Sequence, residues 1–262
     1  MAELEITDLE VSYGRRGTTP TTAISGLSLS VEHGEFISIL GPSGCGKTTV
    51  LKALSGLLTP TSGDIKMPEP PTGADASSYS MVFQDASLFP WYRISRNVAY
   101  GLECRGYSRK DALEKSKPLL DLVGLGDFGE HFPHEVSGGM QQRANLARAL
   151  AVNPALLLMD EPFAALDAQT RELMQAELLR VWSETTKTVL FVTHSIAEAV
   201  YLSDRVIVLS SRPGRVIADI RIELPRPREE LMRVAADFRA YEEQIRLLIE
   251  DQVGRDRQAR AS

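Results

Sequence analysis

The sequence predicts an α/β fold with a mainly parallel sheet. Three apolar runs, residues 36–40, 155–161 and 188–192, have the length and composition of buried strands. Stretches with helical periodicity lie between and after them. Such an alternation of strands and helices is typical of a sheet whose parallel strands are joined through helices.

The run 36–40 leads into a glycine-rich loop and then into a helical pattern over residues 47–58. Glycines let the backbone wrap phosphate groups with its own N–H groups, and the N-terminus of a helix adds a positive dipole. The pattern G-x-x-x-x-G-K-[ST] therefore predicts a triphosphate site, in which Lys47 reaches the phosphates and Thr48 offers a hydroxyl to Mg²⁺. A glycine-rich turn with a chance lysine is the alternative, and the flanking strand and helix count against it. The predicted nucleotide-binding loop consists of Gly41, Pro42, Ser43, Gly44, Cys45, Gly46, Lys47, Thr48 and Thr49.

Two carboxylates end the run 155–161. Neighbouring side chains at a strand end point to different faces, so the two acids need not share one task. Asp160 is predicted to hold Mg²⁺, directly or through water, and Glu161 to polarise the attacking water. A helix cap followed by a solvated acid is the alternative, and it would be preferred if the phosphate loop were absent.

A serine and two glycines, Ser137, Gly138 and Gly139, precede a helical run over residues 140–152. A serine followed by glycines before a helix makes a second N-terminus suited to an anion. An ordinary helix cap explains the same three residues when they are taken alone.

Together these motifs resemble the ATPase subunit of an ATP-binding cassette (ABC) transporter, and the resemblance covers nearly the whole chain. The family motifs occur in the family order. They are Tyr13 for stacking on adenine, the phosphate loop Gly41–Thr49, the Q-loop Gln84, the signature Ser137–Gly139, the acids Asp160 and Glu161, the D-loop Ala165–Asp167, and the switch His194.

The resemblance implies that Gln84 senses Mg²⁺ and water, and that the signature binds the ATP of a second ATPase subunit in a head-to-tail dimer. His194 would orient the γ-phosphate and the water. Tyr13 and His194 have packing or surface roles as alternatives, because single aromatic and histidine side chains usually do. The signature departs from the family consensus at Val136 and Met140, although its serine and glycines are kept.

The order of elements suggests an ATP-binding core over residues 1–224, with a helical subdomain inserted at about residues 85–152. The resemblance implies a P-loop NTPase core and an N-terminal antiparallel β subdomain. Residues 225–262 are predicted to be a C-terminal extension, separated by Pro225 and Pro227. Its amphipathic part, residues 229–253, should pack on the chain's own core, and residues 254–262 should be frayed. We expect the extension to leave no room for a regulatory C-terminal domain of the size that some relatives carry.

Composition supports a globular chain rather than a general nucleic-acid binder. The 262 residues are 43% hydrophobic and carry a formal net charge of −6. Cys45 and Cys104 have no metal-ligand spacing. We expect Cys45 simply to occupy a variable loop position, and the alternative is an accessible thiol whose alkylation would block ATP. The N-terminus has no signal-peptide pattern and no run is long enough to span a membrane, so we expect a peripheral protein at the cytoplasmic face of the inner membrane.

The resemblance also implies partners. They are integral-membrane permease subunits, a second ATPase subunit that can be this same chain, and, indirectly, an extracytoplasmic solute-binding protein. Segments 89–91, 161–171 and 210–216 resemble ATPases of nitrate, sulfonate and taurine importers, which indicates a small anion or related organic solute. Phe89 or Trp91 is expected to contact the permease. The alternatives are a cassette that regulates a membrane complex without transport and one that acts on nucleic acid.

Overall fold

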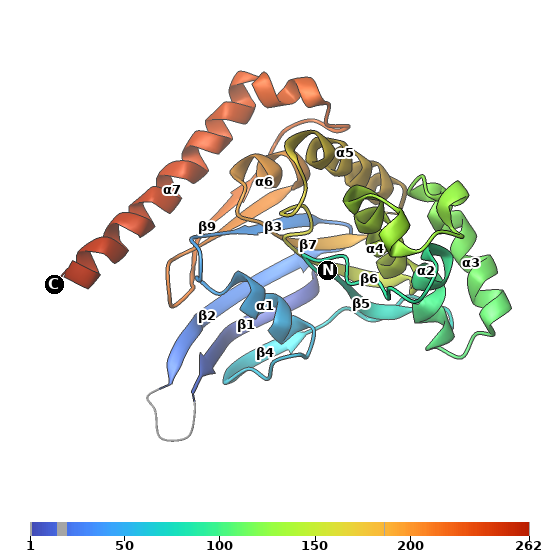
Figure 1. The fold of residues 1–262 in the computed structure, drawn as a ribbon. Coiled ribbons are helices and arrows are strands. Elements are labelled where there is room, and N and C mark those ends of the chain that lie inside the picture. The colour runs from blue at the N-terminus through green and yellow to red at the C-terminus, as the bar shows by residue number, and fades with distance from the viewer. Residues whose placement is uncertain (1, 15–19, 186, 262) are drawn as a thin grey trace. The chain divides into compact units, whose positions relative to one another are not determined.

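A computed structural model describes residues 2–14, 20–185 and 187–261 (Figure 1). The chain divides into two compact units. The first unit comprises residues 1–67 and 188–262, and the second comprises residues 68–187. Among the described residues, no helix combines the length and apolar character that crossing a bilayer requires.

The first unit contains a three-stranded antiparallel sheet in the order β2-β1-β4. Its strands are β1 (Ala2–Tyr13), β2 (Thr21–Glu32) and β4 (Ser62–Lys66). Burial alternates along the second half of β2, where Leu27, Leu29 and Val31 are buried and the residues between them are exposed. This period of two is that of a sheet with one face covered. The predicted N-terminal antiparallel β region is confirmed.

The first unit also contains parallel strands, among which β3 (Phe36–Leu40) pairs with both β7 (Thr188–Val192) and β8 (Arg205–Leu209). β9 (Val216–Arg221) pairs with β8 in antiparallel orientation. All five residues of β3 and all five of β7 are buried. Strands covered on both faces are mainly apolar, which is why the two runs were recognisable in the sequence.

The helices of the first unit differ from the predicted bounds at two places. Helix α1 (Lys47–Leu54) ends before the predicted residue 58, because Gly56 has a φ of +68° and the N–H of Leu58 bonds the carbonyl of Lys52. The predicted frayed tail is helical instead, since α7 (Ala236–Ala261) continues through it. The other helices of this unit are α6 (Ile196–Leu202) and the 3₁₀ helix η3 (Glu230–Val234).

The C-terminal segment packs partly as predicted. Phe238 and Ile245 on α7 are buried, and α7 contacts α6 and β8 of the same unit. Leu231 and Val234 of η3, which the periodicity also assigned to the packed face, are 78% and 64% exposed. The short 3₁₀ turn does not continue the periodicity of the α-helix, so its apolar residues leave the buried stripe.

The second unit combines a parallel strand pair with a helical region. β5 (Ser77–Val82) pairs in parallel with β6 (Pro154–Asp160). Helices α2 and α3 pack against each other and against α4, while α5 contacts α4. These helices are α2 (Ile94–Glu103), α3 (Arg109–Leu122), α4 (Gly138–Ala151) and α5 (Ala168–Thr185), with short 3₁₀ helices η1 (Gly126–Phe128) and η2 (Pro133–Glu135). The boundary of the helical insertion at 85–152 stays a prediction.

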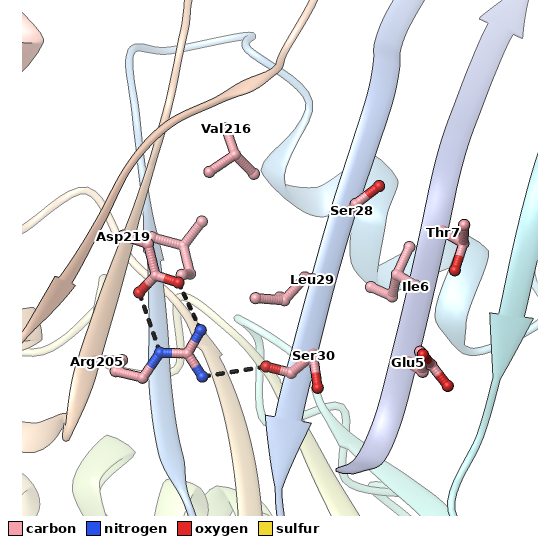
Figure 2. A pocket seen from close by; sticks show the side chains of 10 residues that line it. Glu5, Ile6, Thr7, Ser28, Leu29, Ser30, Arg205, Val216 and Asp219 are labelled. Carbon is pink, nitrogen blue, oxygen red and sulfur yellow. Dashed lines mark hydrogen bonds and ion pairs between the residues drawn. The ribbon is translucent and has the colours of Figure 1, made fainter.

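A pocket of about 420 Å³ lies between the antiparallel sheet and the strands β8 and β9 of the first unit. Figure 2 shows the guanidinium of Arg205 between the carboxylate of Asp219 and the backbone carbonyl of Ser30. Arg205 also donates to Glu35 at 3.0 Å. Its donors are therefore occupied within the protein, and none of the predicted nucleotide-site residues lines this pocket.

Asp204 joins three segments of the first unit. Its Oδ2 accepts from the N–H of Phe36 at 3.0 Å, and its Oδ1 accepts from Arg226 at 2.7 Å. We expect Asp204→Ala to lower the free energy of unfolding by about 2 kcal/mol in urea denaturation, because a backbone donor and a guanidinium lose their acceptor. Asp219→Ala, which removes only the exposed pair with Arg205, should cost about 0.5 kcal/mol. Equal losses in the two variants would contradict this explanation.

Candidate functional site

In the first unit, the phosphate loop and His194 follow neighbouring parallel strands. Ile39 of β3 lies opposite Val192 of β7, so both strands end at the same edge of the sheet. Gly41 follows β3 directly, and His194 comes two residues after β7. The carboxyl edge of parallel strands is where α/β proteins bind ligands. Pairing of β3 with β7 thus brings together two segments that are about 150 residues apart in the sequence.

The phosphate loop runs from β3 into the N-terminus of α1. Lys47 is 7% exposed, and its ammonium donates to the carbonyls of Gly41 at 2.8 Å and Pro42 at 3.2 Å. These bonds hold the lysine charge inside the curve of the loop. Gly46, the N-cap of α1, has a φ of +108°. Side chains of L-residues rarely adopt this conformation, which explains the glycine in physical terms.

Cys45 is a packing residue of the loop. It is buried, and burial raises the pKa of its thiol, although the charge of Lys47 acts in the opposite direction. A Cβ at Gly41 would meet the Sγ of Cys45 at 2.8 Å, so the loop closes around this sulfur. A buried thiol with a raised pKa is a poor nucleophile. The geometry therefore favours the packing interpretation of Cys45 over a reactive one.

Tyr13 lies at the end of β1, and its side chain reaches Thr49 in helix α1. Its hydroxyl is 3.1 Å from the Oγ1 of Thr49, and its side chain is 42% exposed. The ring thus presents an accessible face while its hydroxyl is held beside the phosphate loop. Its stacking on adenine stays a prediction, and this geometry is compatible with it.

In the second unit, Gln84 and the two acids also follow neighbouring parallel strands. Val82 of β5 lies opposite Met159 of β6, so Gln84 and Asp160 emerge at one edge. Glu161 has a φ of +44°, a conformation that is costly for a residue with a side chain. Backbone strain of this kind is commonly found at functional sites. The N–H of Ala164 donates to the carbonyl of Glu161, which closes the turn after the strand.

The signature forms the N-terminus of α4. Ser137 is its N-cap, and its Oγ accepts from the N–H of Met140 at 3.3 Å. A Cβ at Gly139 would meet the side chain of Thr170 at 2.9 Å, whereas a Cβ at Gly138 would meet nothing within 4 Å. Gly139 therefore permits packing of α4 beside the start of α5, and Gly138 leaves the helix end open on the other side.

Asp167 of the D-loop caps α5. Its carboxylate accepts from the N–H of Thr170 at 3.0 Å and from the hydroxyl of Thr170 at 2.7 Å. These hydrogen bonds, the backbone one first, lower the pKa of Asp167. The negative charge is thus held at a helix N-terminus, where the dipole favours it.

Sequence reasoning missed the polar side chains that hold the Q-loop. The Nε2 of Gln142 donates to the carbonyl of Gln84 at 2.8 Å, and Arg148 donates to the carbonyls of Ser87 and Ala86 at 2.9 Å and 3.0 Å. Burial lowers the pKa of Arg148. The available signal was the spacing of Gln142, Asn145 and Arg148 at every third residue on one side of α4.

The oxygen ligands that the motifs provide suit Mg²⁺. The hydroxyl of Thr48 lies in the first unit, and the carboxylate of Asp160 and the amide of Gln84 lie in the second. Mg²⁺ prefers oxygen ligands and is usually held by one or two protein groups, with phosphates and water completing the shell. Within the described residues, no group of three or more histidine, cysteine or acidic side chains forms a metal site of its own. The ligand types are thus those of a metal that arrives with a nucleotide, and a site that combines the three residues stays a prediction.

Comparison with known proteins decides the family. The family model described as ABC transporter matches residues 24–164. The chain belongs to the ABC transporter family. It is an ATPase of this family, built on the α/β fold with the phosphate loop that the sequence predicted.

Relatives and solved structures agree with this assignment. The chain is 41% identical over 266 residues to the nitrate import ATP-binding protein of Synechocystis, covering 99% of each chain. It is 45% identical over 223 residues to the taurine import ATP-binding protein of Roseobacter denitrificans, covering 85% of this chain and 83% of the relative. A dimeric ATP-binding cassette in a post-hydrolysis state, bound to ADP and Pi, superimposes with a TM-score of 0.69 at 29% identity over 85% of this chain and 100% of that one.

The phosphate loop distinguishes two glycines by the space around them. A Cβ at Gly46 would meet the Cδ1 of Ile24 at 2.5 Å and the carbonyl of Ala23 at 3.0 Å, whereas one at Gly44 would meet nothing within 4 Å. Both have positive φ, so each alanine variant carries backbone strain of about 1 kcal/mol. Overpacking should add about 2 kcal/mol in Gly46→Ala only. Unfolding of both variants in urea, without nucleotide, measures the difference, and equal stabilities would contradict it.

Proposed function

We propose that this ATPase is the motor of an importer for a small anionic or related organic solute, of the nitrate, sulfonate or taurine type. Two copies would close head to tail around two ATP molecules at the cytoplasmic face of the membrane. Closure would move the permease to its other access state, and hydrolysis would allow the dimer to reopen. ATP must therefore favour the closed form over the open one.

The observation that carries this proposal is the presence, in one chain, of two helix N-termini whose sequences suit a phosphate. The loop before α1 holds Lys47 among its own carbonyls, and the N-terminus of α4 is open at Gly138. A single ATP molecule that is already held by the loop leaves the second end for the nucleotide of another copy. A two-fold axis makes such an interface self-complementary. The dimeric cassette among the similar structures supports this arrangement.

Each residue group has a chemical task in this proposal. The loop N–H groups and Lys47 bind phosphates, and the strained turn at Glu161 aims a carboxylate at the attacking water. His194 orients the γ-phosphate. Mg²⁺, held through Thr48, Asp160 and Gln84, would neutralise charge on the phosphates.

The solute class rests on the relatives. The nitrate import protein aligns over 99% of this chain, so its similarity includes the C-terminal segment. The taurine import protein aligns over 85%. An importer of this kind would work with permease subunits and, outside the membrane, with a solute-binding protein.

Glu161→Gln tests the hydrolytic step. The amide keeps the size of the side chain but is a far weaker base, so we expect ATP binding to be retained and the steady-state ATPase rate to fall at least about 100-fold. The variant should accumulate as an ATP-bound dimer in size-exclusion chromatography. Normal turnover in Glu161→Gln would remove this residue from the proposed role.

Lys47→Ala is the control for the trapped dimer. Loss of the charge inside the loop should weaken triphosphate binding, so this variant should remain a monomer with ATP. A dimer that forms equally well in both variants would show that association does not depend on bound ATP.

The permease would dock beside the Q-loop, on a groove of about 270 Å³ that lies within the second unit. Trp91 at its edge is 66% exposed and contacts Phe89, with ring centroids 5.6 Å apart. Phe89 is half-buried and also contacts Tyr100, at 4.7 Å. Phe89 thus packs between Trp91 and Tyr100, and Trp91 is the side chain that a partner can cover. Exposed aromatic side chains are frequent anchors of protein interfaces.

We expect Trp91→Ala to weaken co-purification with the permease by at least about 10-fold and to leave the ATPase rate of the isolated chain unchanged. Phe89→Ala should reduce both permease binding and stability. Phe128→Ala is the matched control, because Phe128 is another exposed aromatic residue of the second unit. Intact permease binding and coupled ATPase activity in Phe89→Ala/Trp91→Ala would refute the docking surface.

Co-purification of the tagged chain from gently solubilised membranes tests the partner directly. Recovery of a polytopic permease supports the importer, and solute-stimulated ATPase activity of that complex separates transport from mere regulation of a membrane complex. Recovery of nucleic-acid proteins alone would contradict the transport function, while the ATP chemistry would still stand.

A further inference from the structure

His194 lies in the turn between β7 and α6, close to two buried side chains, Thr193 and Glu198. Its own side chain is exposed, whereas the preceding Thr193 is only 1% exposed. Glu198, one turn into α6, is only 6% exposed. A buried carboxylate is costly unless it is hydrogen-bonded, so the partners of Glu198 indicate what this residue does.

Three hydrogen bonds link Thr193, Ser195 and Glu198 to one another. The N–H of Ser195 donates to the Oγ1 of Thr193 at 3.0 Å, and the Thr193 hydroxyl donates to the Oε2 of Glu198 at 2.5 Å. The N–H of Glu198 donates to the Oγ of Ser195 at 3.3 Å. Of the two chain neighbours of His194, Thr193 therefore bonds the carboxylate of Glu198 directly, and Ser195 is joined to it through the Thr193 hydroxyl.

This arrangement is a capping box in which a hydroxyl group stands between the glutamate and the backbone N–H of the N-cap residue. We call this hydroxyl-mediated link the relay. In the ordinary capping box, a glutamate at the third helical position accepts directly from the N–H of the N-cap residue. Here Ser195 is the N-cap and Glu198 is the third helical residue, but the hydroxyl of Thr193 stands between them. The relay fixes the residue before His194 as well as the residue after it, which an ordinary box would not do.

Thr193 also ties the turn to the strand that leads into the phosphate loop. Its N–H donates to the carbonyl of Ile39 at 3.3 Å, and Ile39 lies two residues before Gly41. The backbone directly before His194 is thus held against the same strand that carries the loop. A histidine that must meet a phosphate on that loop would gain orientation from this anchoring.

We propose that Thr193 and Glu198 are positioning residues, which act on ATP hydrolysis through the orientation of His194. The proposal rests on the proposed role of His194 at the γ-phosphate. Stabilisation of α6 alone does not account for the relay, because Ser195 already caps the helix. The buried pair adds a restraint on the turn, and the turn contains His194.

Thr193→Val tests the relay with little change of shape. We expect kcat for ATP hydrolysis by the full chain to fall between about 10-fold and 100-fold, while KM for ATP changes by less than about 3-fold. Thr193→Ser, which keeps the hydroxyl, should restore kcat to within about 3-fold of the wild-type value. A wild-type kcat in a folded Thr193→Val variant would overturn the proposal.

Glu198→Met approaches the same bond from its other end. It keeps the length of the side chain and removes the acceptor, so kcat should fall as in Thr193→Val. The double variant Thr193→Val/Glu198→Met should lose no more than Thr193→Val alone, because that single variant already breaks the relay between Thr193 and Glu198. Fully additive losses would show that the two residues act separately and would overturn the relay.

A cap on another helix controls for loss of stability. Ser108 caps α3 by accepting from the N–H of Asp111 at 3.2 Å, so Ser108→Ala should lower the unfolding temperature without changing kcat. His194→Ala tests the proposed function itself, and a wild-type kcat there would refute the role of His194. If His194→Ala is impaired, adding Thr193→Val should leave its residual rate unchanged. A further drop would mean that Thr193 acts independently of His194.

Discussion

The register of the parallel strands determines which loops can form the nucleotide site. In the first unit Ile39 lies opposite Val192, and in the second Val82 lies opposite Met159. A shift by one residue would turn every side chain of a strand to the opposite face. Because β3 and β7 are buried along their whole length, their packing on both faces resists such a shift. The strand register therefore sets where the phosphate loop and the turn at His194 begin on this edge, independently of the contacts within the loops.

Buried and partly buried polar side chains hold the loop that follows β5 in the second unit. Asn97 is fully buried and bonds both the N–H and the carbonyl of Phe89. Gln142 and Arg148 bond carbonyls of the Q-loop from α4. An unpaired buried polar group costs about as much as a lost hydrogen bond, which makes these side chains specific for one loop conformation. The same principle explains why the buried side chains of Thr193 and Glu198 favour one conformation of the turn at His194.

The sequence predicted the parts of the fold that are covered on both faces. Strand β3 was predicted with its observed bounds because all of its residues are buried and four of the five are apolar. Element ends were harder, since they depend on local geometry. The left-handed Gly56 ends α1 early, and α7 continues past Gly254. The supporting polar residues were missed because Gln142 and Arg148 are of types that usually face solvent, and only packing reveals that Gln142 is buried and Arg148 partly buried. The site motifs were visible since glycines and acids at those spacings have few other uses, although their roles stay predictions.

Helix α6 is short, yet it helps to position the turn that contains His194. It has seven residues, Ile196–Leu202, and a helix of this length is unstable in isolation. Its orientation is therefore set by its ends. At the N-terminus the relayed capping box satisfies the first donors, and at the C-terminus Arg228 donates to the carbonyls of Val200 and Tyr201 at 2.8 Å and 2.9 Å. Burial lowers the pKa of Arg228 to about 10, so it remains charged at neutral pH and complements the negative end of the helix dipole. Different chemistry thus holds the two ends, and a rigid α6 gives His194, which directly precedes the N-cap Ser195, a defined place relative to β3.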